Sequence, residues 1–396
     1  MAIQQIAGVD TSSPDPKEVR IIIIDPEGTL TIQMYTTPAD SRDRFISGAG
    51  SLTHGRLLAT IKASRKIVLE NSDYFAEELR KRQLNMKGTK LLERLTFDIK
   101  SENITSVELW LRAIHPEATM TDEMYNISIK DVWNTLHASR TYEFNLEVLS
   151  DWFVEWVSRK GGDHCGKFTV LELSQLMFPC RSFENHKAFA HVTCRYAYEK
   201  AGHCDENNPT PYHNLHLPPG IFGGLNNART NLKTKIHQAL YPPIRGFLSG
   251  SCSCRKEGLY AYQMALDKTG AWPLEEKLHG NDAISIRELL GRLANFNYEA
   301  PNKDCELCST DYKTFTVDLC IQSVLEYFEG LCLSCIDYPM NKKSFPEFLP
   351  FDGGEKVFDK DCHFAHGQPT WWFSWLASRE RRKDQPRNNQ PRNNEP

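Results

Sequence analysis

Two pairs of cysteines with the same spacing are the residues of this chain with the clearest chemistry. Cys305 and Cys308 form one C-x-x-C pair, and Cys332 and Cys335 form a second one further along the chain. Zinc is bound by four thiolate or imidazole ligands in a tetrahedron, and a C-x-x-C turn places two sulfurs within reach of one ion. The spacing therefore predicts a structural metal site, and zinc is the metal that these ligands favour.

Further potential ligands lie on both sides of these pairs. A C-x-C motif precedes them and the sequence DCHFAHG follows them. His366 is favoured over His363 because a three-residue gap lets its ring turn back towards an ion bound by Cys362. We predict two closed sites, the first formed by Cys252, Cys254, Cys305 and Cys308, and the second by Cys332, Cys335, Cys362 and His366. The alternative is one site built from the two C-x-x-C pairs alone, and the spacing does not choose between the arrangements.

Cysteine is also a good small core residue, so a lone thiol predicts packing rather than metal binding. Cys320 falls inside an expected helix, and the other cysteines lack paired spacing. We expect core packing or exposure to solvent for this second group, which consists of Cys165, Cys180, Cys194, Cys204 and Cys320.

A catalytic zinc is the competing chemistry, because it needs only three protein ligands, an open position for water and a nearby carboxylate. Asp361, Cys362 and His366 have the residue types for such a site. Sets of four ligands close the ion off instead. The chain also contains no G-x-S-x-G elbow, P-loop, G-x-G-x-x-G or H-E-x-x-H motif. We therefore expect a protein that is not an enzyme.

The numbers of acidic and basic residues indicate which classes of partner the chain is expected to bind. Lys and Arg number 47 against 51 Asp and Glu, a formal net charge of −4, so nothing attracts phosphate backbones or anionic membranes in general. Acidic residues also outnumber basic ones between positions 245 and 337, where a DNA-binding module would be basic. We expect neither nucleic acid nor a membrane as partner, and a zinc-containing transcription-related regulator is the alternative function. No secretory signal is recognisable, which predicts a cytoplasmic or nuclear protein.

The elements that position these ligands follow from hydrophobic patterns. Two β-rich runs flank the turn from Asp25 to Gly28, which predicts a β-hairpin. Further strands are expected at GRLLATIKAS and KLLERLTFDI, and apolar residues at helical spacing predict several helices up to about position 160. The remainder is expected to be mainly helical, with one long helix ended by Pro242 and Pro243.

We predict an α+β protein of five parts. They are a disordered N-terminus (1–17), a mixed domain (18–160), a helical linker region (161–245), a cysteine-rich, zinc-stabilised helical module (246–378) and a disordered tail (379–396), whose repeated Q-P-R-N-N sequence is typical of disorder.

The order of elements in residues 18–160 resembles the BTB/POZ domain. IKASRKIVLENSDYFAEEL is similar to the family's strand and following helix with its Tyr-Phe pair, and HASRTYEFNLEVLSDWFVEWV is similar to its late helix pair. The insert TTPADSRDRFISGAGSLTHG departs from the compact family pattern. The resemblance implies a fold whose surfaces self-associate or bind protein partners, in some relatives a cullin scaffold.

A second resemblance covers most of residues 250–380. GLCLSCID, HGQPTWWFSW and GAWPLEEKLHG are similar to the cysteine-rich region that accompanies BTB domains in a family of fungal proteins. Members commonly carry an aspartate in place of Ser334, which implies that this residue is not a ligand. The resemblance implies an intracellular fungal protein with no established reaction. The expected function is protein–protein interaction or an adaptor role, with structural zinc in the C-terminal half.

Overall fold

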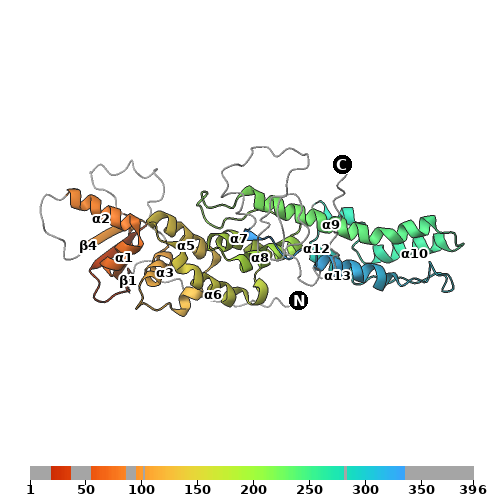
Figure 1. Ribbon diagram of the computed structural model, residues 1–396, viewed down its shortest axis with the longest axis horizontal. Coiled ribbons are helices and arrows are strands. Elements are labelled where there is room, and N and C mark those ends of the chain that lie inside the picture. Colours follow the sequence, from red (N-terminus) through yellow and green to blue (C-terminus); the bar gives the residue numbers. More distant parts are fainter. Residues whose placement is uncertain (1–18, 37–54, 86–94, 101–102, 281–282, 335–396) are drawn as a thin grey trace, which may run out of the picture. The chain divides into compact units, whose positions relative to one another are not determined.

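The structure of the 396-residue chain is a computed structural model (Figure 1). It describes residues 19–36, 55–85, 95–100, 103–280 and 283–334. The chain forms two compact units, residues 1–149 (unit 1) and 150–396 (unit 2). Unit 1 combines a small sheet with helices, whereas the described part of unit 2 is helical. The predicted α+β class is therefore confirmed, and both predicted disordered ends lie outside the described residues.

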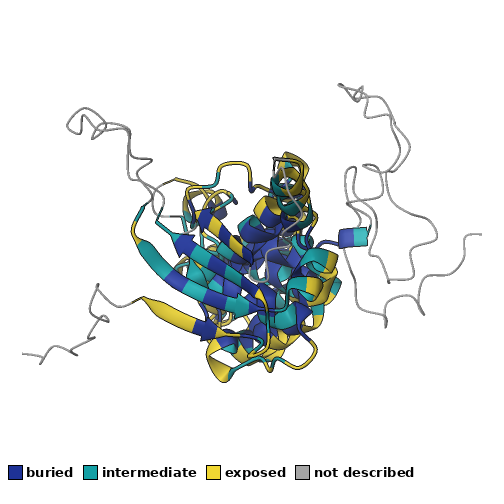
Figure 2. Cartoon of the chain, turned by 90° about the vertical axis from the view of Figure 1, so that its left-hand side faces the viewer, coloured by how far each residue is buried: buried dark blue, intermediate teal, exposed yellow. Residues whose placement is uncertain are grey.

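Unit 1 contains a four-stranded mixed sheet with the strand order β1-β3-β2-β4. The strands are β1 (Arg20–Ile23), β2 (Leu30–Tyr35), β3 (Leu57–Ala63) and β4 (Leu95–Lys100). β2 and β3 run antiparallel, whereas β1 pairs with β3 and β2 pairs with β4 in parallel. Buried residues alternate with more exposed ones along β2 and β4, as Figure 2 shows, because successive side chains of a strand point to opposite faces.

The predicted β-hairpin is wrong, because β3 lies between β1 and β2. The turn itself forms, and the N–H of Gly28 donates to the carbonyl oxygen of Asp25 at 3.1 Å. Gly28 passes so close to the end of β3 that a Cβ atom there would lie 2.2 Å from the carbonyl oxygen of Ala63. A tight turn reverses the chain, but it does not determine whether the two strands that flank it pair with each other. Here β3, a later strand, lies between them.

The helices of unit 1 pack beside this sheet. They are α1 (Arg65–Asn71), α2 (Asp73–Asn85), α3 (Ile104–Ile114), α4 (Asp122–Tyr125) and α5 (Ile129–Tyr142), followed by the 3₁₀ turn η2 (Leu146–Leu149). The buried Trp110 joins α3 to α5, since its Nε1–H donates to the carbonyl oxygen of Thr135 at 2.9 Å. A capping box between Ser128 and Asp131 fixes the start of α5.

Unit 2 begins with α6, which we expected in the first domain. Its Phe153 stacks on Phe183 with ring centroids 4.4 Å apart. The elements of unit 2 are α6 (Ser150–Gly161), η3 (Asp163–Cys165), α7 (Val170–Ser182), α8 (His186–Glu199), α9 (Pro219–Ser249), α10 (Arg255–Lys268), α11 (Leu274–Leu278), α12 (Ile286–Leu293), η4 (Lys313–Asp318) and α13 (Leu319–Leu325). In the part of the chain that is described, no helix has both the length and the apolar character needed to cross a membrane.

The long helix α9 continues through Pro242 and Pro243, so the prediction that these residues end it is wrong. A proline in a helix interior costs about 3 kcal/mol or more, because it removes a hydrogen bond and its ring clashes with the preceding turn. Beyond the prolines, Ile244 and Phe247 are buried, and the packing of α10 on α9 outweighs this local cost. The two helices lie side by side in Figure 1, and the loop between them holds the C-x-C motif.

Candidate metal centre

Two loops of unit 2 bring the first predicted ligand set together. Cys252 and Cys254 lie in the loop between α9 and α10, whereas Cys305 and Cys308 lie between α12 and η4. The four Sγ atoms all lie within 4.8 Å of one another. The pairing of the C-x-C motif with the first C-x-x-C pair is therefore as predicted.

The spacing of these sulfurs fits a tetrahedral metal ion. Zinc–sulfur bonds of about 2.3 Å place the sulfurs of a tetrahedral site about 3.8 Å apart. The Sγ atoms of Cys254 and Cys308 are 3.3 Å apart, so a small outward movement would admit the ion between them. Cys308 is buried and the other three thiols are half-buried. Soft thiolate ligands in a tetrahedral arrangement select zinc or an iron–sulfur centre rather than magnesium or calcium.

Hydrogen bonds and burial separate the pKa values of Cys252, Cys305 and Cys308. The backbone N–H of Cys308 and the thiol of Cys254 donate to Cys305 and lower its pKa to about 7. Burial instead raises the pKa of Cys308 far above the usual range, and burial is also the first cause that raises the pKa of Cys252. Cysteine binds metal as the thiolate. Of these three thiols, Cys305 is therefore the one that most readily supplies a thiolate at neutral pH.

Gly258, which the sequence analysis missed, allows the two loops to approach each other. Its N–H donates to the carbonyl oxygen of Cys254 at 2.9 Å. A Cβ atom at this position would lie 2.6 Å from the ring of Phe247 and 3.1 Å from the Sγ atom of Cys308. The only signal in the sequence is a glycine four residues after the C-x-C motif, where an ordinary helix would favour alanine.

A layer of aromatic rings supports the cysteine loops. Tyr298 donates its hydroxyl proton to the carbonyl oxygen of Cys308 at 2.9 Å. The buried ring of Tyr262 on α10 lies 5.3 Å from the ring of Tyr312 and 5.5 Å from that of Phe296, both in edge-on contacts. These rings connect α10 to the loop that carries the C-x-x-C pair. The loops that carry the four thiols thus pack against aromatic side chains, although no spacing rule identifies these residues from the sequence.

The second predicted ligand set falls mostly outside the described residues. This holds for Cys335, Cys362 and His366, and for Asp361 of the catalytic alternative. Cys332 is described, is 3% exposed and does not belong to the group of four thiols. The structure therefore places the first C-x-x-C pair with the C-x-C motif rather than with Cys332, and the second site stays a prediction.

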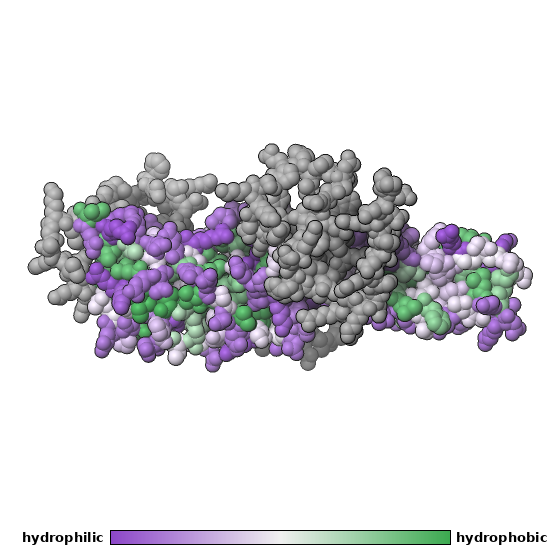
Figure 3. Space-filling view, in the orientation of Figure 1, coloured by the Kyte–Doolittle hydropathy of each residue, from purple (hydrophilic) through white to green (hydrophobic). Residues whose placement is uncertain are grey.

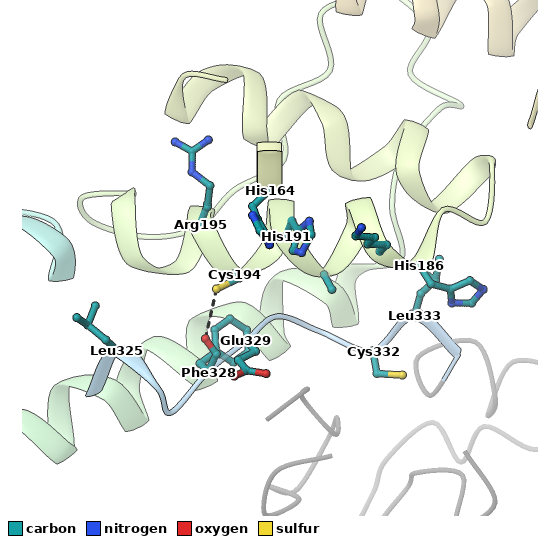
Figure 4. Close-up of a pocket in the computed structure, with 12 residues that line it drawn as sticks. His164, His186, His191, Cys194, Arg195, Leu325, Phe328, Glu329, Cys332 and Leu333 are labelled. Carbon is teal, nitrogen blue, oxygen red and sulfur yellow. Dashed lines mark hydrogen bonds between the residues drawn. The ribbon is translucent and has the colours of Figure 1, made fainter. Parts of the chain in front are cut away.

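Cys332 lines a cavity of about 600 Å³ in unit 2 (Figure 4). Gly330 lets the segment that carries Cys332 pack closely against α8. Its φ is +109°, and a Cβ atom there would lie 2.1 Å from the carbonyl oxygen of Ala190. The rings of His164 and His191 lie close together at the cavity, with centroids 4.6 Å apart. Among the described residues, however, only the four-thiol group gathers three or more metal donors at one point.

The five cysteines without paired spacing, for which we predicted core packing or exposure to solvent, mostly pack in the core. Cys165, Cys180, Cys204 and Cys320 are buried, whereas Cys194 is half-buried and donates to the carbonyl oxygen of Phe328 at 3.3 Å. Burial raises the pKa values of Cys165, Cys204 and Cys320 to about 11. These thiols keep their protons at neutral pH, which suits packing rather than metal binding or nucleophilic chemistry.

No family model, curated protein or solved structure matches the chain, so comparison with known proteins identifies no relative. The geometry of the four thiols is therefore the observation on which a functional argument rests.

Proposed function

We propose that this chain is a non-enzymatic interaction or adaptor protein whose second unit is stabilised by structural zinc. The observation that carries the proposal is the convergence of Cys252 and Cys254 with Cys305 and Cys308. Four thiolates brought so close repel one another unless a cation neutralises part of their charge. Zinc is the cation that best fits four sulfur ligands in a tetrahedron.

The closed ligand set supports a structural rather than a catalytic ion. Four thiolates fill the tetrahedral coordination of zinc and leave no position for water or substrate, whereas catalytic zinc keeps one position open. Within the described residues, the group contains no carboxylate that could act as a general base. An ion at this centre would link the α9–α10 loop to the loop before η4, and its binding energy would become folding energy.

The interaction role is assigned to the sheet edge of unit 1. β1 is an edge strand, and no strand in the described ranges pairs with its outer side. Ile21 and Ile23 point to the same face and are 77% and 56% exposed. Figure 3 has hydrophobic surface in the region where Figure 1 labels β1 and α3. Exposed apolar edge strands pair readily with another chain, so we assign self-association to β1.

The BTB/POZ resemblance supports the same assignment, because that family self-associates or binds protein partners through its surfaces. The resemblance also admits a cullin as partner, although no described residue identifies the contact. The net charge of −4 argues against nucleic acid.

The metal part is tested by measuring the metal content of full-length protein purified without added zinc or chelator. We expect zinc bound stoichiometrically, together with protection of Cys252, Cys254, Cys305 and Cys308 from a thiol reagent. Folded protein that contains no metal and whose four thiols all react freely would contradict the structural role.

The interaction part is tested by light scattering on the zinc-loaded chain. We expect a dimer for the unmodified chain and a monomer for the double variant Ile21→Glu and Ile23→Glu. Leu171→Glu on α7 is the matched control, because this leucine is 57% exposed and lies in unit 2. Equal masses for both variants would remove β1 from the proposal, and an unmodified chain that stays monomeric at high concentration would remove self-association.

A further inference from the structure

A second cavity of unit 2, with a volume of about 560 Å³, lies beside α9. Gly223, Asn226, Thr230 and Lys233 line it at intervals of three or four residues, so one face of the helix forms its wall. The opposite side is formed by two loops, one after α8 and one after α11. The loop residues that face the cavity include Gly202, His203, His279 and Gly280.

Among the described residues that line this cavity, the charged side chains are all basic. Arg229 is 3% exposed, and Lys233 is half-buried four residues further along α9. No carboxylate belongs to the described residues that line the cavity. Burying a guanidinium group without an opposite charge is costly, because the loss of water is not repaid by an ion pair. Among the described residues, the lining of the cavity therefore supplies positive charge and no carboxylate to balance it.

Backbone carbonyl groups compensate only part of the positive charge of Arg229 and Lys233. Arg229 donates to the carbonyl oxygen of Ala197 at 2.9 Å and to that of Lys200, which follows the end of α8. Lys233 donates to the carbonyl oxygen of Leu278, the last residue of α11, at 3.0 Å. A helix C-terminus carries about half a negative charge, so two such termini do not balance two full positive charges. The pKa of Lys233 is lowered by burial first and then by Arg229, in agreement with an excess of positive potential.

Three glycines leave room for a ligand next to the backbone. A Cβ atom at Gly202, Gly223 or Gly280 would meet no heavy atom within 4 Å. Gly202 and Gly280 have φ angles of +71° and +85°, which other residues rarely adopt. The cavity thus combines open space, two cationic side chains and polar groups from Thr230 and Asn227.

We propose that this cavity binds a phosphate group carried by a small organic molecule. A phosphate group is an anion that forms charge-assisted hydrogen bonds, which suits a cavity with basic side chains on one helix and two loops around it. Lys233 contacts the anion, and the buried Arg229 supplies positive potential behind it. The cavity is larger than one phosphate ion, so the ligand extends beyond its charged group. This inference is independent of the zinc centre and of the sheet edge.

The test is calorimetric titration of the zinc-loaded, full-length chain with inorganic phosphate, glucose 6-phosphate and glucose at constant ionic strength. We expect glucose 6-phosphate to bind and glucose not to bind. Stronger binding of glucose 6-phosphate than of inorganic phosphate would identify a phosphate ester as the ligand class. Binding of inorganic phosphate alone would still support the anion site but overturn the organic ligand.

Two matched variants separate this site from general attraction of anions to the surface. Gly223→Glu places a carboxylate over the cavity, whereas Gly291→Glu places one on α12, and the Cβ atom of either variant has open space. Both changes replace a helical glycine by a better helix former, so folding is not at risk. We expect Gly223→Glu, and also Lys233→Gln, to weaken binding at least tenfold, and Gly291→Glu to leave it unchanged. Equal binding by the two glutamate variants, or no binding of either phosphate probe to the unmodified chain, would overturn the proposal.

Discussion

The Sγ atom of Cys308 lies 3.3 Å from the Sγ atom of Cys254, although 54 positions separate the two residues in the chain. Cys254 immediately precedes α10, and Cys308 closes the C-x-x-C turn on the loop before η4. The contact therefore joins the α9–α10 loop to a later loop of unit 2. A metal ion at this point would make the folding of both segments depend on one bound cation.

Replacing Cys308 by serine should remove one zinc ion per chain and lower the melting temperature of unit 2. Zinc binding contributes about 10–16 kcal/mol to the folding of small zinc peptides, which equals or exceeds the roughly 5–15 kcal/mol net stability of an ordinary domain. Metal analysis and thermal unfolding followed by circular dichroism measure both effects. Cys320→Ala is the control, because Cys320 is equally buried but does not belong to the four-thiol group. A Cys308→Ser protein with undiminished zinc would show that the thiol is not a ligand.

Gly258→Ala should weaken the metal centre even though alanine is the better helix former. Helix propensity alone predicts a gain of about 1 kcal/mol, but the new methyl group would lie 2.6 Å from Phe247 and 3.1 Å from the Sγ atom of Cys308. Overpacking of this kind costs about 1–3 kcal/mol. Competition with a chromogenic zinc chelator should therefore release the ion faster from this variant. Gly291→Ala, where a Cβ atom meets nothing within 4 Å, should retain zinc as the unmodified chain does; similar release from both would refute the steric argument.

The four thiols that the structure brings together could be proposed from the sequence because cysteine spacing is a local property with a direct chemical meaning, but the spacing left open which pairs share a site. Two sulfurs on one short turn can reach one ion whatever the rest of the fold does. Tyr298 and Phe247, in contrast, support the site only through contacts made after folding. Their positions depend on how α9, α10 and the later loop meet, and no pattern within one segment contains that information.

The same distinction explains the two errors in the fold. The turn at Gly28 was predictable from its residues, but the insertion of β3 beside it depends on a segment far along the chain. Likewise, Pro242 and Pro243 have an unfavourable local effect in α9, which the burial of Phe247 beyond them outweighs. The cationic cavity beside α9 could not be predicted from the sequence either, because Lys233 and His279 come together only through the packing of unit 2.

The stability of unit 2 should fall as the pH rises from about 9 to 11. Burial raises the pKa values of Cys165, Cys204 and Cys320 from 9.0 to about 11. Between these values the unfolded thiols have lost their protons and the folded thiols have kept them, so proton release favours unfolding. Each thiol contributes a slope of up to about 1.4 kcal/mol per pH unit, which is absent below pH 9. Urea unfolding at pH 8, 9 and 10 measures this slope.

Cys320→Ala provides the matched comparison for this pH effect. The variant lacks one of the three thiols whose pKa values rise to about 11, so its stability should fall less steeply above pH 9 than that of the unmodified chain. Parallel curves for the two proteins would mean that Cys320 does not keep its proton in the folded state.

Metal counting on variants of the second predicted set distinguishes two zinc sites from one. If Cys332, Cys335, Cys362 and His366 hold their own ion, the chain binds two zinc ions and Cys362→Ser reduces the count to one. The remaining ion should stay with the four thiols that include Cys254, because Cys332 lies outside that group. A single site made from the two C-x-x-C pairs predicts a different pattern, in which Cys335→Ser removes all zinc and Cys254→Ser removes none. One zinc ion per chain that survives both Cys335→Ser and Cys362→Ser, but not Cys254→Ser, would leave the four-thiol centre as the complete metal site.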